Sequence, residues 1–137
     1  MSTPRRHILA VDDSDEVLDV FRLLLEEEGY RVTTRRYVLT SLDEIRADPP
    51  DLVILDYLWA GDDAGWSMLQ LLRLDRITAK TPIVLCTGAK KEVKALGDRL
   101  TRQNVRVILK PFDIDELLRA ITLALDAPTF GPAATGG

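Results

Sequence analysis

Acidic side chains directly follow two apolar runs of the sequence. Asp12 and Asp13 come after residues 7–11, and Asp56 comes after residues 52–55. Apolar runs of this length, separated by helical patterns, predict buried parallel strands, whose carboxyl ends meet at one edge of a sheet where ligands bind. Three carboxylates gathered there repel one another unless a proton or a cation intervenes, and a hard divalent cation suits their oxygens. The sequence therefore predicts a magnesium site, and magnesium suggests phosphate chemistry.

Two further strand ends supply a hydroxyl and an ammonium group. Thr87 follows the apolar run 82–86, and Lys110 follows residues 105–109. Phosphoryl transfer needs positioning and charge neutralisation more than covalent help, so these two groups would hold phosphoryl oxygens while two carboxylates hold the metal. The isolated Asp56 is then the expected nucleophile, and its attack on phosphorus would give an acyl phosphate.

Each of these residues also has an ordinary structural interpretation when it is taken alone. An aspartate after a strand, such as Asp13, is often a helix cap. Thr87 before Gly88 can shape a turn, and Lys110 can be a surface lysine. The functional interpretation rests on their joint arrival at one edge of the sheet in strand order.

Apolar periodicity predicts five strands that alternate with five helices. The strands are expected at residues 7–11, 30–34, 52–55, 82–86 and 105–109. Ser14 and Asp113 are the expected N-caps of the first and last helices, and Gly29 should end the first. A short amphipathic helix is expected at residues 39–47. The expected buried stripes of the other four helices are Val17, Val20, Phe21, Leu24 and Leu25; Met68, Leu69, Leu71 and Leu72; Val93, Leu96 and Leu100; and Ile114, Leu117, Leu118, Ile121 and Leu125. Five such repeats predict an α/β fold with a doubly wound, five-stranded parallel sheet and helices on both faces.

Length and charge narrow the class of protein. The chain has 137 residues, 46% of them hydrophobic, which suits one domain with its own core. The net charge of −4 argues against binding nucleic acid directly by phosphate neutralisation. The single cysteine, Cys86, cannot form an internal disulfide, and no apolar stretch approaches the roughly 20 residues that cross a bilayer. With no signal peptide before the first strand, a cytoplasmic protein is expected.

The pattern also predicts the limits of the domain. Residues 1–6 are expected to be an N-terminal extension and residues 7–126 the folded domain. Residues 127–137 are rich in proline and glycine and lack apolar periodicity, which predicts a disordered tail without an output module.

Four short motifs resemble those of the receiver domain of two-component response regulators, the CheY-like family. They occur in the same order and spacing, and the resemblance covers residues 7–126. The motifs are Val11-Asp12-Asp13-Ser14, Leu55-Asp56, Cys86-Thr87-Gly88 and Leu109-Lys110-Pro111-Phe112. The resemblance implies the flavodoxin-like receiver fold and a stand-alone signalling domain rather than an enzyme in the usual sense.

The resemblance also implies a role for each site residue. Asp56 would take a phosphoryl group from a phosphohistidine on a sensor histidine kinase. Magnesium would be held by Asp13, Asp56 and the backbone carbonyl of Leu58, with Asp12 assisting partly through water. Lys110 would pair with the phosphoryl group and precede a cis peptide bond, and Thr87 would move inward to report phosphorylation.

The downstream consequences follow from the same resemblance. Thr87 would report to a face built by the helix near residues 93–100, the strand at 105–109 and the last helix, where an unidentified protein binds or two copies pair, so that a monomer or a homodimer is expected. Onward relay of the phosphoryl group is the other expected route of signalling.

Some positions depart from the family pattern. Val107 stands where the family often has an aromatic residue, and Trp59-Ala60 replaces the usual pair after the phosphoacceptor. Neither Leu58 nor Ala89, two residues beyond Asp56 and Thr87, can orient an attacking water, so that slow self-catalysed loss of the phosphoryl group is expected.

Two alternatives stay open from the sequence. Asp13-Ser14-Asp15 with Val17 also fits the nucleophile motif of haloacid-dehalogenase-like phosphatases, although that interpretation leaves Asp56 without a role. The altered positions would also suit an interaction module that keeps the receiver fold and works without phosphorylation. The only histidine, His7, begins a strand, which favours a structural role over phosphorelay.

Overall fold

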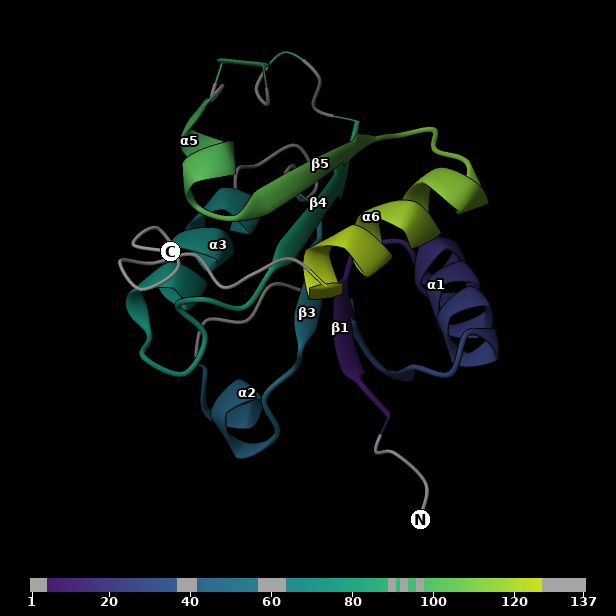
Figure 1. Ribbon diagram of the computed structural model, residues 1–137, viewed down its shortest axis with the longest axis horizontal. Helices are drawn as coiled ribbons and strands as arrows, with labels where there is room; N and C mark the ends of the chain where they lie inside the picture. Colours follow the sequence, from purple (N-terminus) through teal and green to yellow (C-terminus); the bar gives the residue numbers. More distant parts are fainter. Residues whose placement is uncertain are drawn as a thin grey trace.

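The protein is built around a five-stranded parallel sheet with the strand order β2-β1-β3-β4-β5 (Figure 1). The computed structural model describes residues 5–36, 42–56, 64–88, 91, 94–95 and 98–126. The chain passes from β1 outward to β2 and then returns to the other side of β1 to form β3. This reversal between β1 and β3 is the place where open α/β sheets form ligand sites.

The strands follow the apolar runs closely. They are β1 (His7–Val11), β2 (Arg31–Arg35), β3 (Leu52–Leu55), β4 (Ile83–Thr87) and β5 (Val105–Leu109). Every residue of the three inner strands is buried. This burial on both faces explains why these runs are continuously apolar rather than alternating.

Helices connect the strands and cover both faces of the sheet. The described helices are α1 (Asp15–Glu27), α2 (Asp43–Ala47), α3 (Ala64–Leu74), α5 (Asp98–Arg102) and α6 (Ile114–Asp126). Figure 1 shows α1 and α6 on one side of the sheet and α2, α3 and α5 on the other. The doubly wound α/β fold expected from the sequence is confirmed.

Two apolar layers hold the helices against the sheet. Successive residues of a strand point to opposite faces, so that Leu9 belongs to the layer under α2, α3 and α5, while Ile8 and Ala10 belong to the layer under α1 and α6. Phe21 of α1 stacks on Phe112 in the second layer, with ring centroids 5.8 Å apart. The sheet is therefore fixed from both sides, which holds its strand ends in place.

The predicted helix ends are confirmed by their hydrogen bonds. The Ser14 hydroxyl accepts from the Val17 N–H, and the Asp113 carboxylate accepts from the Glu116 N–H. Gly29 has a φ of +93° and follows α1 with the paired hydrogen bonds of a helix stop that uses a left-handed residue. Asn104 takes the same conformation, with a φ of 60°, between α5 and β5.

Some expected positions differ from the structure. β2 and β4 each begin and end one residue later than expected. Val20 is 46% exposed, Leu71 is 37% exposed and Ile114 is 48% exposed, although all three were expected in buried stripes. On α1 the buried face is formed by Leu18, Phe21 and Leu25, because only one narrow stripe of the helix meets the sheet.

Several expectations lie outside the described residues. These are residues 39–41 of the helix expected at 39–47, the side chains of Val93 and Leu96, residues 1–4 and the tail 127–137. Leu42, also expected in that helix, is described and precedes α2, which begins at Asp43. For the helix expected between the fourth and fifth strands, the structure gives α5 and the burial of Leu100.

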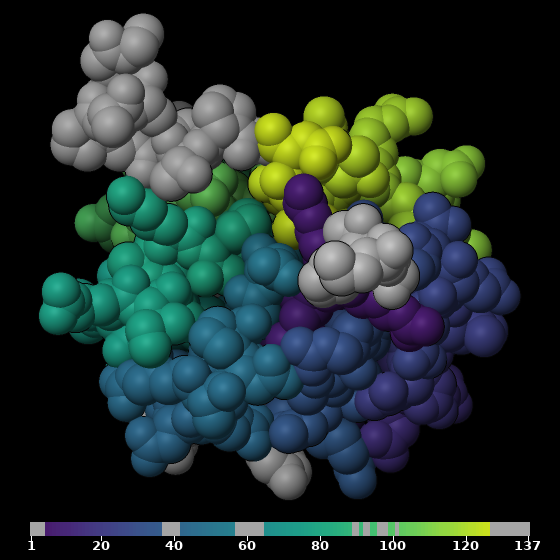
Figure 2. Space-filling view, turned by 60° about the horizontal axis from the view of Figure 1, so that its bottom comes forward, coloured from purple at the N-terminus to yellow at the C-terminus, as the bar shows by residue number. Residues whose placement is uncertain are grey.

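Figure 2 looks onto the end of the molecule opposite the carboxyl ends of the strands. There the last turn of α6 lies beside the first of the described residues, and the Arg6 guanidinium donates to the Leu125 carbonyl at 3.2 Å. Among the described residues, no helix has both the length and the apolar content needed to cross a membrane.

Candidate functional site

Four strands deliver polar residues to one edge of the sheet, the upper edge in Figure 1. Asp12 follows β1, Asp56 follows β3, Thr87 ends β4 and Lys110 follows β5. Backbone hydrogen bonds tie these ends together: the Asp56 N–H donates to the Val11 carbonyl, and the Lys110 N–H donates to the Thr87 carbonyl at 2.9 Å. The strand ends expected from the sequence therefore meet in space.

Three carboxylates gather at this edge. Oxygen atoms of Asp12, Asp13 and Asp56 all lie within 4.8 Å of one another. Asp12 is 1% exposed and Asp56 is 7% exposed, whereas Asp13 faces solvent. The Ser14 N–H donates to Asp12 Oδ1 at 3.0 Å and so fixes the orientation of the buried carboxylate. The cluster thus joins two buried carboxylates to one that solvent or a ligand can reach.

Lys110 reaches across the sheet edge to this cluster. Its Nζ lies 2.7 Å from Asp12 Oδ2 and 3.4 Å from Asp56 Oδ2. The peptide bond between Lys110 and Pro111 is cis, as the resemblance implied. The lysine is bonded more closely to Asp12 than to the expected nucleophile, a preference that the sequence did not indicate.

Burial and the neighbouring charges shift the pKa values of the site. Desolvation raises the pKa of Asp56; Lys110 and a hydrogen bond from Thr87 oppose this rise, while the charge of Asp12 adds to it. Desolvation lowers the pKa of Lys110, but the hydrogen bond to Asp12 and the charges of both aspartates outweigh it, so that the net shift is upward. Asp56 is therefore a carboxylate whose charge the protein alone does not fully compensate.

Thr87 is fully buried behind the acidic cluster. Its side chain is hydrogen-bonded to Asp56, and this bond favours the charged form of that carboxylate. The neighbouring Cys86 is 1% exposed, and burial raises the pKa of its thiol to about 12. At neutral pH this thiol is protonated, so that the hydroxyl and the carboxylates are the reactive groups of this edge.

The donor set suits a magnesium ion. Every side-chain ligand it offers is a carboxylate oxygen, and three such groups face a single lysine. Within the described part of the chain, no hydrogen bond or ion pair occupies the Asp13 carboxylate. Oxygen ligands, excess negative charge and one solvent-facing carboxylate are what a partly hydrated magnesium ion needs. Leu58, whose carbonyl was expected to be a ligand, lies outside the described residues.

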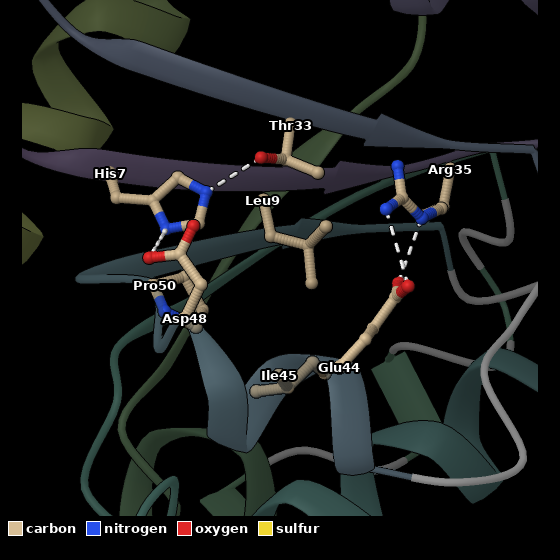
Figure 3. A pocket seen from close by; sticks show the side chains of 8 residues that line it. All are labelled: His7, Leu9, Thr33, Arg35, Glu44, Ile45, Asp48 and Pro50. Atoms are coloured by element: carbon tan, nitrogen blue, oxygen red, sulfur yellow. Dashed lines mark hydrogen bonds and ion pairs between the residues drawn. The ribbon is translucent and has the colours of Figure 1, made fainter.

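A polar cavity lies between α2 and the part of the sheet face formed by β1 and β2 (Figure 3). It has a volume of about 110 Å³. Its lining residues are His7, Leu9, Thr33, Arg35, Glu44, Ile45, Asp48 and Pro50. Figure 3 shows that its polar groups point at one another rather than into an open space.

The contacts of this cavity are those of a structural site. His7 is 4% exposed, and its Nε2 lies 2.7 Å from Thr33 Oγ1. Arg35 binds Glu44 through two hydrogen bonds of 2.8 and 3.2 Å. Each polar group therefore already has a partner, which supports the structural interpretation of His7 and leaves the strand-end carboxylates as the candidate functional site.

The sequence matches the profile of the response regulator receiver domain over residues 8–122. Among curated proteins, the transcriptional regulatory protein YkoG of Bacillus subtilis, itself uncharacterized, is 34% identical over 123 residues, which cover 87% of this chain and 50% of that protein. The chain spans about half the length of the curated relatives it matches.

Solved structures share the fold. A protein described as a response regulator from Chloroflexus aurantiacus is 27% identical, with a TM-score of 0.76 over 89% of this chain and 98% of that one. The receiver domain of the sensor histidine kinase PA1611 from Pseudomonas aeruginosa is 23% identical, with a TM-score of 0.74 over 90% of this chain and 100% of that one. That structure holds a magnesium ion in its active site cleft.

Proposed function

The chain belongs to the response regulator receiver domain family, and from this premise we propose that Asp56 accepts a phosphoryl group from a phosphohistidine of a sensor histidine kinase. Receiver domains are signalling domains of two-component systems, and residues 7–126 would form the receiver here. The observation that carries the proposal is the buried Asp56 carboxylate beside Asp12, Asp13 and a single lysine. A cation bound at this site would compensate its excess negative charge and could at the same time bind phosphoryl oxygens.

The proposed step conserves atoms and charge. An oxygen of the Asp56 carboxylate attacks phosphorus, the bond between phosphorus and the histidine nitrogen breaks, and the imidazole leaves with the bonding electron pair. The product is an acyl phosphate on Asp56. The acyl phosphate carries the negative charge of the phosphoryl oxygens in place of the carboxylate charge, so that Lys110 and a bound magnesium ion would be needed to compensate it.

The other side chains would stabilise the transferred group. Lys110 Nζ already lies 3.4 Å from Asp56 and can turn from Asp12 towards a phosphoryl oxygen. The Thr87 hydroxyl, now bonded to Asp56, can donate to another phosphoryl oxygen. Asp12, Asp13 and Asp56, with the Leu58 carbonyl, would hold magnesium, which when bound neutralises phosphoryl charge. The magnesium-containing receiver from Pseudomonas is consistent with this assignment.

We propose that the protein signals as a stand-alone receiver, by binding a downstream protein when phosphorylated or by passing the phosphoryl group on. Movement of Thr87 towards the phosphoryl group would break its bond to Asp56 and bias the packing of the residues after β4. Loss of the phosphoryl group is expected to be slow, because Leu58 and Ala89 carry no polar group that could orient water. Decay of labelled phosphoprotein within seconds would contradict this.

Intact-protein mass after incubation with acetyl phosphate and magnesium tests the proposal. The wild-type protein should gain one adduct of about 80 Da, whereas Asp56→Asn should gain none. Asp19→Asn is the matched control, because Asp19 is an exposed carboxylate of α1 that does not belong to the strand-end cluster. Its adduct should equal that of the wild type, and chelation of magnesium should suppress both.

The alternatives predict different results. A folded wild-type protein that takes no phosphate from acetyl phosphate or from a phosphorylated kinase would instead support an interaction module that works without phosphorylation. Continuous release of phosphate would support a phosphatase. Family membership already sets aside the haloacid-dehalogenase-like alternative.

A further inference from the structure

A groove lies between α3 and α5 on the face of the sheet opposite α1 and α6 (Figure 1). It has a volume of about 460 Å³. Its lining residues are Trp66, Gln70, Arg99, Arg102 and Gln103. None of these residues belongs to the strand-end site, so the groove requires its own account.

Two arginines give the groove its charge. Arg99 and Arg102 are exposed, lie one helical turn apart on α5, and have neither a hydrogen bond nor an ion pair with another described residue. Four other arginines of the described part of the chain carry ion pairs: Arg31 with Asp48, Arg35 with Glu44, Arg36 with Asp15, and Arg46 with Asp43 and Asp75. Arg5, Arg76 and Arg119 are also exposed and have no such contact with a described residue, but only Arg99 and Arg102 line the groove together, where both guanidinium groups are available for an external anion.

The walls of the groove are held in place before any ligand arrives. Arg73 of α3 is largely buried and donates from Nε to the Gln103 carbonyl at 2.7 Å and from a terminal nitrogen to the Asn104 carbonyl at 3.4 Å. The Gln70 amide donates to the Gln103 amide oxygen at 3.4 Å. These contacts fix α3 relative to the end of α5, so that little ordering is required on binding.

Apolar side chains lie beside the two arginines of the groove. Trp66 is half-buried and packs against the layer of the core under α3 and α5. Leu74 is 83% exposed and lies one turn beyond Gln70 on α3, where i and i+4 residues share a face. The groove and its surroundings therefore present guanidinium groups, side-chain amides and apolar side chains next to one another.

We propose that this groove binds an acidic segment of a partner protein, with carboxylates of the segment on Arg99 and Arg102 and an apolar side chain against Trp66. Guanidinium groups bind carboxylates through paired hydrogen bonds, and Trp and Arg commonly dominate binding energy at interfaces. The amides of Gln70 and Gln103 can bond the backbone of the segment. Two arginines on a protein of net charge −4 are too few for a nucleic acid, whose binding draws on many phosphate contacts. The binding does not depend on whether Asp56 accepts phosphate.

Selection from a phage library of random linear peptides tests the proposal. The wild-type protein is the bait, and the variant Arg99→Glu/Arg102→Glu is used for counter-selection. Selected peptides should combine Asp or Glu with an apolar residue. The affinity of the best peptide, measured by fluorescence anisotropy, should fall at least about tenfold with the double variant and fall with added salt.

Two more variants sharpen the test. Gln70→Glu places a negative charge in the groove and should weaken binding of the same peptide. Lys80→Glu/Arg119→Glu makes the same change in net charge at exposed residues outside the groove and should bind like the wild type. Circular dichroism melts should show all variants folded.

The proposal is overturned if selected peptides carry no acidic residues or bind the Arg99→Glu/Arg102→Glu variant equally well. It is also overturned if both double variants weaken binding to the same extent, because net charge would then explain the effect. Binding of a single-stranded oligothymidylate through Arg99 and Arg102, with no acidic peptide selected, would assign the groove to nucleic acid instead.

Discussion

Two clusters of charged residues in this protein have similar contact distances and opposite character. In the strand-end cluster of Asp12, Asp13, Asp56 and Lys110, three carboxylates share one lysine, and two of them are buried. In the α2 ion pairs, Arg31 binds Asp48 at 2.8 Å and Arg35 binds Glu44 at 2.8 Å, each cation with its own carboxylate and all four side chains open to solvent.

The difference in charge balance and burial distinguishes a charged cluster that stabilises the fold from one that is suited to bind a ligand. Matched exposed pairs gain little from any additional ion, because each charge is already compensated and water screens it. An unbalanced buried cluster is stabilised by an additional cation, because the protein itself leaves negative charge uncompensated. Charge balance and burial, rather than the number of ion pairs, identify the site.

The largest effect is expected from removing the single cation of the strand-end cluster. Lys110→Met leaves the buried Asp12 carboxylate without its ion pair and should lower the free energy of unfolding by about 3 kcal/mol, as for broken buried pairs. Urea denaturation without magnesium measures this. Lys80→Met, at an exposed lysine, is the control and should change little. A loss no larger than that of the control would mean that Lys110 does not stabilise the buried carboxylates.

Magnesium should stabilise the protein through the same cluster. At a concentration of one hundred times its dissociation constant, the gain in the free energy of unfolding is about 2.7 kcal/mol, seen as a rise in the melting temperature. Asp13→Asn should weaken the gain, whereas Glu44→Gln in the α2 ion pairs should leave it intact. If sodium chloride at equal ionic strength reproduced the rise, general screening would explain it and the metal site would be refuted.

The two clusters should respond to pH with opposite sign. The pKa of Asp56 is raised by folding, so that its contribution to stability is present below the unfolded value near 3.8 and is lost as pH rises through the folded pKa. The pKa of Asp48 is lowered by its hydrogen bond to Arg31, so that its contribution is present above the unfolded value and is lost as pH falls.

Metal-free urea denaturation from about pH 2.5 to pH 7 measures these signs, because the contribution of Asp48 is lost only as pH falls below its unfolded value of 3.8. Relative to the wild type, Asp56→Asn should become more stabilising as pH rises, and Asp48→Asn should become more destabilising. The same slope in both variants would contradict the assignment.

The smallest effect is expected at an α2 ion pair. Arg35→Met should lower the free energy of unfolding by about 0.5 kcal/mol, since exposed ion pairs contribute little. The difference from the wild type should shrink in high salt, because screening weakens the attraction between Arg35 and Glu44 in the wild-type protein. A loss comparable to that of Lys110→Met would remove the distinction between the clusters.

The sequence predicted the fold well because its inner strands are continuously apolar and buried on both faces. It also predicted that Asp12, Asp56, Thr87 and Lys110 would meet, because parallel strands place all their carboxyl ends at one edge. Both predictions depend only on strand order and direction.

The sequence could not predict which side chains pair within the site. Lys110 is closer to Asp12 than to Asp56, which depends on the reach of one flexible side chain rather than on strand order. The exposure of Val20, Leu71 and Ile114 was also missed, because apolar spacing marks a wide face of a helix while the sheet covers only part of it. The groove between α3 and α5 joins segments far apart in sequence and left no local pattern.

The thiol of Cys86 can report local opening of the sheet. Its thiol lies inside β4 at 1% exposure, and with a pKa of about 12 it stays in the unreactive form while the sheet is intact. Alkylating reagents can therefore label it only in molecules whose sheet has opened, and the labelling rate measures how often that happens. Because Cys86 is the only cysteine of the chain, each modified molecule records one such opening next to the strand-end site.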